Sequence, residues 1–423
     1  MKAAVVGLGY AGLPLAIRLS QLNFDVLGID INTRKISKLK SGKLPFAKDE
    51  PNLEKYFKTE YKRGKLLFTT SFQEISTQDL IFINVDTPIS SINLNYSSLK
   101  SALRSISPNI KKNTIVIIES TIAPKTCDSI IKPLIIKYSN LHVNKEFFIV
   151  HAPERIRPKY IFKQLTTLPR VIGISSKKIK SKILNIYSQI TKGEVDIVDI
   201  VTAEVVKTTE NANRDVNIAF SNEIAVACEE LKVNVWDVRE LINKAPLRDM
   251  HAPGAGVGGH CIPKDSLLLA RSVKNSKMNL IKSSRNINNS MPLHMFILAR
   301  NALKKLGKNI EEANVTILGY SFVENSDDYR NSPSQSLLRI LDKYKIKYRV
   351  NDPYIEKYKN NIYEILKSSD CMLLMVGHRQ YKKLDFNKIA KIMSTKIIID
   401  GRNAFARKSL EKKGFIYQGI GNV

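Results

Sequence analysis

The sequence is short of cysteine and of long apolar runs. Its cysteines, Cys127, Cys228, Cys261 and Cys371, are scattered among 423 residues, with no CxxC pair and no Cys/His metal spacing. This argues against a disulfide framework and against a metal site, and it fits a reducing, cytoplasmic setting. The apolar runs have the length of strands, far below the roughly 20 residues of a membrane-spanning helix.

Two further absences narrow the choice of protein class. The apolar start resembles a signal peptide, but glycines interrupt it and no cleavage site follows, so we interpret it as a strand. Acidic residues are too few to balance the basic ones, which leaves a formal net charge of +28. Because the lysines and arginines are spread through the chain, a lysine-rich surface is favoured over a nucleic-acid groove, and a small anionic substrate would benefit from the same field.

A glycine-rich turn follows the first predicted strand, residues 3–6. Gly7, Gly9 and Gly12 form a GxGxxG motif between this strand and an apolar helix start, which is the context of a dinucleotide-binding turn. A second strand, residues 25–29, leads to Asp30, whose carboxylate would bind a ribose diol and repel a 2′-phosphate. The motif therefore predicts NAD rather than NADP. Lys35 would face the adenosine phosphate or point into solvent.

Polar residues follow three further predicted strands, at 80–85, 114–119 and 147–150. They include Thr87 after the first of these strands, Thr121 after the second, and Glu154 with Arg155 after the third. With helices between the strands, the pattern predicts a doubly wound α/β domain. Ligands bind at the carboxyl ends of such strands, so we expect these three loops to converge near the cofactor.

A long helix without glycine or proline is predicted over residues 202–231. At 1.5 Å per residue it would extend about 45 Å, long enough to serve as the spine of a homodimer. Lys207, Asn211 and Arg214 are spaced to share one helix face. That face is either part of a site or a solvated polar stripe.

Residues 250–266 place four glycines before a single cysteine, Cys261, with Lys264 and Asp265 after it. Dense glycine lets a backbone approach a ligand closely, so this loop could present a nucleophilic thiol. The alternative is a tight turn with a buried, inert cysteine.

The last third of the chain repeats the alternation of strands and helices, with strands predicted at 315–318, 348–350, 372–376 and 397–399. We expect a second nucleotide-type domain, in which Arg330 and Arg402 either hold phosphates or form exposed salt bridges. The predicted domains are 1–195 for NAD binding, 196–305 as a central helical domain and dimer spine, and 306–423 as a C-terminal α/β domain. The predicted fold is α/β, with two doubly wound Rossmann-like domains joined by a long central helix.

Several motifs occur in an order that resembles the UDP-glucose/GDP-mannose dehydrogenase family from end to end. They are Gly7-Leu8-Gly9-Tyr10-Ala11-Gly12, Glu119-Ser120-Thr121, Pro153-Glu154-Arg155, Lys207 with Asn211, Gly258-Gly259-His260-Cys261-Ile262-Pro263-Lys264-Asp265, and Asp327-Asp328-Tyr329-Arg330-Asn331-Ser332-Pro333. Within the family, the segments around Asn211 and His260 resemble the branch that oxidises UDP-N-acetylhexosamines, particularly UDP-N-acetyl-D-mannosamine. UDP-N-acetylglucosamine and UDP-glucose are the alternative substrates.

The resemblance implies a four-electron oxidation of a primary alcohol to a carboxylate, with two NAD per turnover and a uronic acid for polysaccharide synthesis as the product. Asp265, Lys207 and a water near Thr121 would handle the alcohol proton. Cys261 would form a thiohemiacetal and then a thioester. Lys207 and Asn211 would stabilise the oxyanion, and Glu154 would activate the hydrolytic water.

The resemblance also assigns residues that hold ligands. The cofactor set is Gly7, Gly9, Tyr10, Gly12, Asp30, Lys35, Thr87, Thr121 and Arg330. The substrate set is Arg155, Lys207, Asn211, Arg214, Gly258 and Arg402, with His251 or Arg248 reaching across a dimer interface.

One departure from the family is Val323, which stands where the family usually has a substrate-contacting lysine. Two other functions stay open from the sequence. A two-electron hydroxyacid dehydrogenase would make one NADH per product and would not need Cys261. A non-catalytic nucleotide-sugar binding protein has Val323 as its sequence support.

Overall fold

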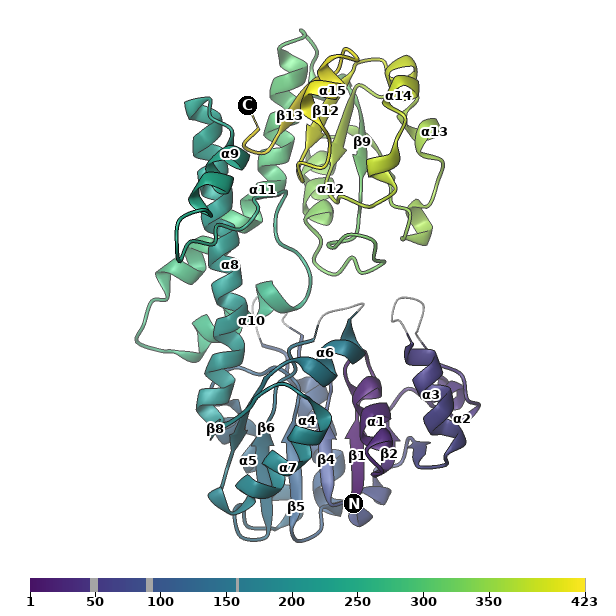
Figure 1. The fold of residues 1–423 in the computed structure, drawn as a ribbon, viewed down its shortest axis with the longest axis vertical. Helices are drawn as coiled ribbons and strands as arrows, with labels where there is room; N and C mark the ends of the chain where they lie inside the picture. The colour runs from purple at the N-terminus through teal and green to yellow at the C-terminus, as the bar shows by residue number, and fades with distance from the viewer. Residues whose placement is uncertain (46–51, 89–93, 157–159, 423) are drawn as a thin grey trace. The chain divides into compact units, whose positions relative to one another are not determined.

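The computed structural model describes residues 1–45, 52–88, 94–156 and 160–422 (Figure 1). The chain divides into two compact units, Met1–Glu210 with Arg271–Lys274, and Asn211–Ala270 with Asn275–Val423. The boundary falls within helix α8 (Ile200–Leu231), which confirms the long helix predicted from the sequence. Within the described ranges, no helix is long and apolar enough to cross a membrane.

The described part of the first unit is built on one eight-stranded sheet with the order β3-β2-β1-β4-β5-β6-β7-β8. Strands β6 and β7 pair antiparallel, and the other neighbours in this sheet pair parallel. The strands are β1 (Lys2–Val6), β2 (Asp25–Ile29), β3 (Leu66–Thr69), β4 (Leu80–Ile83), β5 (Thr114–Ile118), β6 (Phe147–His151), β7 (Arg170–Ile174) and β8 (Val195–Asp199).

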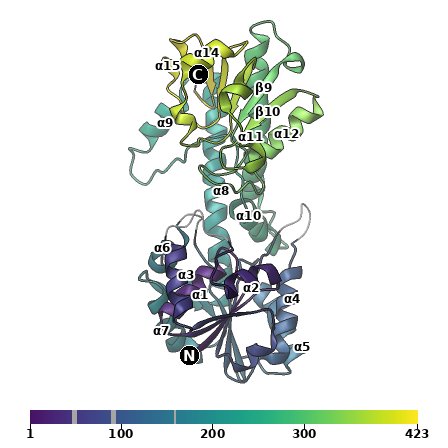
Figure 2. The same ribbon diagram turned by 90° about the vertical axis from the view of Figure 1, so that its right-hand side faces the viewer.

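Helices cover both faces of this sheet (Figure 2). One face packs on helices α1 (Gly12–Gln21), α2 (Thr33–Lys40), α3 (Leu53–Lys62), α6 (Ile161–Thr167) and α7 (Lys180–Ile190), and the other packs on α4 (Ser97–Ile106) and α5 (Lys132–Ser139). Because apolar side chains are buried on both faces, β4 and β5 are continuous apolar runs, as is typical of parallel strands between helices. The strand order reverses between β1 and β4, and ligands bind at the carboxyl ends beside such a reversal.

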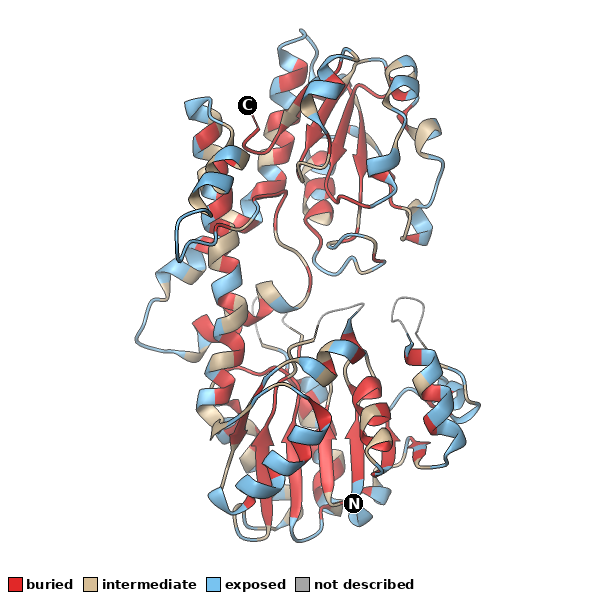
Figure 3. Cartoon of the chain, viewed as in Figure 1, coloured by how far each residue is buried: buried red, intermediate tan, exposed pale blue. Residues whose placement is uncertain are grey.

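The described part of the second unit contains a five-stranded parallel sheet with the order β10-β9-β11-β12-β13. Its strands lie buried between two layers of helices (Figure 3). The strands are β9 (Asn314–Leu318), β10 (Lys347–Asn351), β11 (Cys371–Leu374), β12 (Ile397–Asp400) and β13 (Ile416–Gly419). Besides the second half of α8, the α-helices that begin in this unit are α9 (Val235–Ile242), α10 (Cys261–Ser272), α11 (Asn279–Lys304), α12 (Pro333–Lys343), α13 (Ile362–Leu366), α14 (Phe386–Ile392) and α15 (Arg407–Glu411).

The structure corrects two predicted boundaries. The glycine-rich loop does not extend to residue 266, because α10 begins at Cys261. A helix that the residue pattern predicts from about Met291 to Leu306 is α11, which begins instead at Asn279, with Pro292 inside it. Strands β3, β7, β8 and β13 were not predicted from the sequence.

Candidate active site

The turn between β1 and α1 has the backbone geometry that its glycines make possible. Gly7 has φ of +92°, and a Cβ on Gly7 would lie 2.4 Å from the carbonyl oxygen of Asn84. A Cβ on Gly12 would lie 1.9 Å from the carbonyl oxygen of Gly7, so neither position accepts a side chain. Among the described residues nothing lies within 4 Å of the Cβ position of Gly9, which leaves that side of the turn open. This is the shape that a bound pyrophosphate requires.

Asp30 closes the same turn from the end of β2. Its Oδ2 accepts a hydrogen bond from the backbone N–H of Leu8 at 2.9 Å, and its Oδ1 accepts one from the N–H of Asn32 at 2.9 Å. A carboxylate has about four acceptor positions, so Asp30 can still accept hydrogen bonds from ribose hydroxyls. Lys35 Nζ lies 2.5 Å from Asp30 Oδ2, so Lys35 forms an ion pair and does not simply point into solvent. Its contact with the adenosine phosphate stays a prediction. The glycine turn and Asp30 together fit NAD.

Replacing Asp30 with asparagine should raise the KM for NAD about tenfold, because a charge-assisted hydrogen bond to the ribose is worth roughly 1.5 kcal/mol or more. The discrimination against NADP should fall in the same variant. Initial rates measured with each cofactor test this, and exchanging Lys62, an exposed lysine of α3, for methionine is the control. An unchanged KM for NAD would remove Asp30 from the cofactor site.

The loops after β4 and β5 meet as predicted. Thr87 Oγ1 donates a hydrogen bond to the carbonyl oxygen of Thr121 at 2.7 Å, and Ser120 Oγ donates to Val85 O at 2.7 Å. The buried carboxylate of Glu204, on α8, accepts hydrogen bonds from the backbone N–H groups of the segment that follows Thr121, including that of Cys127 at 2.8 Å. Helix α8 therefore holds this loop in place, a role that the sequence did not reveal.

The loop after β6 is joined to α8 through Lys207. Its ammonium donates to the carbonyl oxygen of Glu154 at 2.5 Å, and the side chain is 6% exposed, so at this position the solvated-stripe interpretation is wrong. Arg155 forms an ion pair with Glu210, one helical turn after Lys207 on α8. The structure thus brings together Lys207, Glu154 and Arg155, all of which were predicted from the sequence.

Buried groups under this loop were missed by the sequence reasoning. Arg170 donates to the carbonyl oxygen of Pro153 at 3.1 Å and lies 3.4 Å from the Glu119 carboxylate, which also accepts a hydrogen bond from the Tyr187 hydroxyl. Burial raises the pKa of Glu119, although the charge of Arg170 opposes this. These groups support the backbone of the residue before Glu154.

His151, at the end of β6, is fully buried and faces Ile118 O through Nδ1 at 3.1 Å. Burial lowers the pKa of His151 to about 3, and the nearby charge of Lys207 acts in the same direction. Its imidazole is therefore neutral near pH 7, and Lys207 is the cation of this pair.

Cys261 opens helix α10 in the second unit and is exposed, whereas the other three cysteines are buried. The interpretation of Cys261 as a buried, inert residue is therefore wrong. Asp265 lies one turn further on the same helix, 1% exposed, and its Oδ2 accepts a hydrogen bond from Asn211 Nδ2 at 2.6 Å. The structure thus brings together Asn211, on α8, and Asp265, on the helix that begins with Cys261. Lys264 Nζ lies 3.8 Å from Asp265 Oδ1.

Glycines before Cys261 let the chain lie close against the segment that follows β9. Gly259 has φ of +86°, and a Cβ there would lie 2.6 Å from the Phe322 ring. A Cβ on Gly258 would lie 2.7 Å from Asn331 O. The N–H of Gly259 donates to Arg330 O at 2.9 Å, which fixes the approach to the cysteine.

The two arginines of the C-terminal sheet differ. Arg402 donates from Nε to Met375 O at 2.8 Å and approaches Gly256 O with Nη2 at 3.5 Å, so it lies against the glycine segment and not in an exposed salt bridge. Burial lowers the pKa of Arg402, opposed by Glu324 and Asp400. Arg330 is 52% exposed and pairs with Asp328 at 2.6 Å, as the salt-bridge interpretation expected. Its predicted contact with NAD stays a prediction.

The remaining predicted residues lie at the surface or partly buried. Arg214 is exposed on α8, and Arg248 is exposed with Nη1 donating to Pro246 O at 2.8 Å. His251 is partly buried, 3.7 Å from Asp249. Val323 is 38% exposed. Their predicted contacts with substrate stay predictions.

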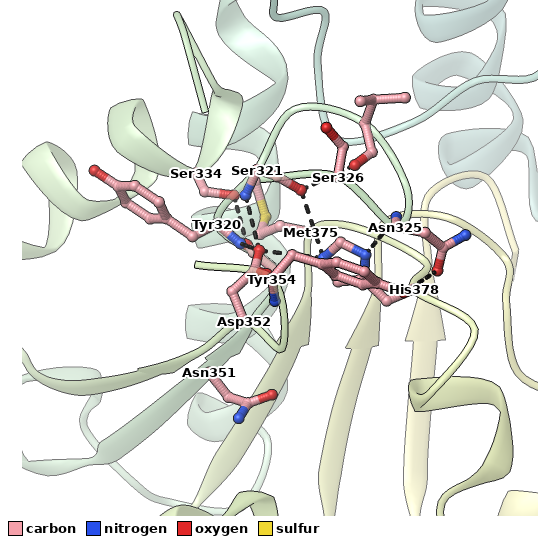
Figure 4. Close-up of polar contacts among 12 residues, drawn as sticks. Tyr320, Ser321, Asn325, Ser326, Ser334, Asn351, Asp352, Tyr354, Met375 and His378 are labelled. Carbon is pink, nitrogen blue, oxygen red and sulfur yellow. Dashed lines mark hydrogen bonds and ion pairs between the residues drawn. The ribbon is translucent and has the colours of Figure 1, made fainter. Parts of the chain in front are cut away.

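A buried cluster beside the C-terminal sheet contains Ser321, His378 and Asp352 (Figure 4). Its residue types suggest a catalytic triad, but His378 Nε2 faces both Asp352, at 3.1 Å, and Ser321, at 3.5 Å. Nδ1 accepts the N–H of Asn325 at 2.8 Å, so the serine and the aspartate compete for one nitrogen. A triad needs them on opposite nitrogens. The cluster instead fastens residues 320–325 to the ends of β10 and β11.

Within the described ranges, no group of three or more His, Cys, Asp or Glu side chains could hold a metal ion.

Comparison with known proteins gives three matches to sequence models of the UDP-glucose/GDP-mannose dehydrogenase family. They are the NAD binding domain over residues 1–191, the central domain over 201–290 and the UDP binding domain over 316–407. A UDP-N-acetyl-D-mannosamine dehydrogenase of Pyrococcus horikoshii is 36% identical over 421 residues, covering 100% of this chain and 99% of its own.

Two solved structures are also similar. That of UDP-D-ManNAc dehydrogenase from Pyrococcus horikoshii has a TM-score of 0.94 at 36% identity and covers 100% of this chain and 99% of its own. That of NDP-N-acetyl-D-galactosaminuronic acid dehydrogenase from Methanosarcina mazei Go1 has a TM-score of 0.90 at 32% identity, with 100% and 95% coverage.

Proposed function

Because the chain belongs to the UDP-glucose/GDP-mannose dehydrogenase family, whose members are NAD-dependent nucleotide-sugar dehydrogenases, we propose that it oxidises UDP-N-acetyl-D-mannosamine to the corresponding uronic acid. The names of its relatives support an N-acetylhexosamine as the sugar. The observation that carries the chemistry is the exposed Cys261 at the start of α10, with Asp265 held by Asn211 one turn away.

In the first oxidation, the primary alcohol of the sugar loses its hydroxyl proton and becomes an aldehyde. Asp265 takes up that proton, with a water held near Thr121 as the relay, and the Lys207 ammonium stabilises the alkoxide as it forms. The glycine turn and Asp30 would hold NAD, which would supply the hydride acceptor for each of the two oxidations.

Cys261 then captures the aldehyde. Its thiolate adds to the carbonyl carbon, and the resulting oxyanion is stabilised by Lys207 and Asn211 before it is protonated to a thiohemiacetal. One N–H of the Asn211 side chain donates to Asp265, and the amide has a second N–H that can serve the oxyanion. Covalent capture prevents release of a reactive aldehyde. The second oxidation converts the thiohemiacetal into a thioester.

Hydrolysis of the thioester completes the reaction. Glu154 removes a proton from water, the hydroxide adds to the acyl carbon, and the carbon–sulfur bond breaks to return the Cys261 thiol and release the uronic acid. The backbone of this residue is fixed by the hydrogen bond from Lys207 to Glu154 O. Glu154 Oε2 also accepts the N–H of Ile156 at 2.7 Å, which orients the carboxylate.

We assign the UDP moiety to basic residues. Arg155, Arg214 and Arg402 bind the diphosphate and its nucleoside, and Gly258 lets the substrate approach the backbone. Arg248 or His251 contributes across a homodimer built on α8. We assign NAD binding to 1–195, the central helices to 196–305 and UDP-sugar binding to 306–423. The enzyme works in the cytoplasm and supplies a uronic acid for a surface polysaccharide.

Counting NADH formed per uronate tests the proposal. The purified protein would be incubated with NAD and UDP-N-acetyl derivatives of mannosamine, glucosamine and galactosamine, with UDP-glucose as a further substrate. We expect two NADH per acid and the highest kcat/KM with UDP-N-acetyl-D-mannosamine. One NADH per product would indicate a two-electron dehydrogenase, and the absence of uronate with every sugar would overturn the proposal.

A further inference from the structure

We propose that Asp215 is a positioning residue for Cys261, acting through hydrogen bonds that fix both flanks of the nucleophile; this rests on the proposed covalent function. Asp215 lies on α8, one turn after Asn211, and its side chain is fully buried. A buried carboxylate is costly unless it is paired and hydrogen-bonded, so its partners indicate what it holds.

The first contact of Asp215 reaches the helix that begins at Cys261. Ser266 Oγ donates to Asp215 Oδ2 at 3.0 Å. The adjacent residue, Asp265, accepts the hydrogen bond from Asn211, so two neighbouring residues of α10 are joined to two successive turns of α8. These contacts fix the position of the first turns of α10 against α8.

A second set of contacts reaches α11. Arg285 Nη1 lies 2.5 Å from Asp215 Oδ1, and Asn288 Nδ2 donates to the same oxygen at 2.7 Å. Arg285 is 5% exposed, so Asp215 is the counter-charge of a buried cation. The carboxylate therefore joins three helices, α8, α10 and α11.

Asn288 continues the network to the glycine segment before Cys261. Its Oδ1 accepts a hydrogen bond from Asn222 Nδ2 at 2.8 Å, and Asn222 Oδ1 accepts the N–H of Gly254 at 2.8 Å. Asn222 and Asn288 are both buried. The chain is thus held seven residues before Cys261 and five residues after it by one connected set of buried polar groups.

An asparagine at position 215 has nearly the same volume but a single acceptor oxygen, so it cannot accept from Ser266 on one side and from Arg285 and Asn288 on the other. It also leaves the Arg285 charge uncompensated. Released from Asp215, the Ser266 hydroxyl can bond to Ile262 O, which already lies 3.1 Å away within α10. The expected result is a displaced α10 and a misplaced thiol.

The test compares Asp215→Asn with Ser266→Ala, which breaks only the contact to α10, and with Asp370→Asn as the matched control. Asp370 also pairs with a cation, Lys308, at 2.7 Å, beside β9 and β11. We would measure kcat, the KM for NAD, and the rate at which iodoacetamide alkylates Cys261 as a function of pH, by mass spectrometry of the cysteine-containing peptide.

We expect Asp215→Asn to lower kcat about 100-fold, the effect of a misplacement near 1 Å, with the KM for NAD within about twofold of the wild type. The pH profile of alkylation should shift in Asp215→Asn and, to a smaller extent, in Ser266→Ala, and stay unchanged in Asp370→Asn. If Asp215→Asn fails to fold, Ser266→Ala carries the test alone. An alkylation profile and kcat that match those of Asp370→Asn would overturn the proposal. Because alkylation needs no substrate, this outcome is distinct from failure of the NADH stoichiometry in the wild type.

Discussion

Serine in place of Cys261 should abolish steady turnover, lowering kcat by about 10³-fold or more, while NAD binding is unchanged. A thiolate is readily formed near neutral pH and adds to an aldehyde, whereas a serine hydroxyl needs a base that is strong enough to activate it. The carbon–oxygen ester formed in its place would also be released less readily than a thioester. The first oxidation does not need the thiol, so a slow release of aldehyde with one NADH is expected.

The measurement is a single-turnover experiment followed at the NADH absorbance, together with a titration of NAD binding. Cys228→Ser is the matched control, since Cys228 is buried on α8 and lies in the same unit. The kcat of this control should stay within about twofold of the wild-type value, because a buried cysteine that only packs takes no part in the reaction. Two NADH per uronate at an undiminished rate in Cys261→Ser would remove the covalent step.

The dinucleotide-binding part of the fold could be predicted from the sequence because its signals are local. Strands such as β4 and β5 are continuous apolar runs, and Gly7, Gly9 and Gly12 stand at the positions where the turn has no room for a side chain. Strands β7 and β8 carry polar residues and are less apolar, and β7 runs antiparallel to β6. Their assignment depends on pairing with distant strands, which no local pattern reveals.

Helix boundaries were harder to predict where glycine and proline stand next to a helix. Gly258 and Gly259 suggested that the loop continued past Cys261, although Pro263 in the first turn of α10 is a position where helices accept proline. In α11 a proline had the opposite effect. The helix was predicted to begin too late, near Pro292, although Pro292 lies within the helix. Tertiary contacts of Arg285 and Asn288 with Asp215 hold the turns before it.

In the candidate site, too, residues with a local sequence signal could be predicted and residues that depend on distant contacts could not. Spacing placed Lys207 and Asn211 on one face of α8, and continuing that spacing by four residues would have included Asp215. The role of each of these residues depends on how deeply its side chain is buried. That burial is set by the loops packed against the helix, which the spacing does not reveal. Arg170 and Glu204 had no sequence signal of this kind, because the groups that they contact, a carboxylate and backbone groups for Arg170 and backbone groups for Glu204, lie elsewhere in the chain.

The second large effect is expected for Lys207→Ala, which should lower kcat by 10²- to 10³-fold, the usual cost of losing a donor to a developing oxyanion. Lys207 is the cation beside the neutral His151, and its ammonium fixes the backbone of Glu154, so its loss affects both the oxyanion and the hydrolytic carboxylate. Stopped-flow measurement of each hydride step would show both steps slowed, with the KM for NAD unchanged because the glycine turn and Asp30 are intact. Lys244→Ala, which removes an exposed lysine of an α9 ion pair, is the control. If Lys207→Ala retained wild-type rates in both steps, Lys207 would be a support for the Glu154 loop and not a catalytic residue.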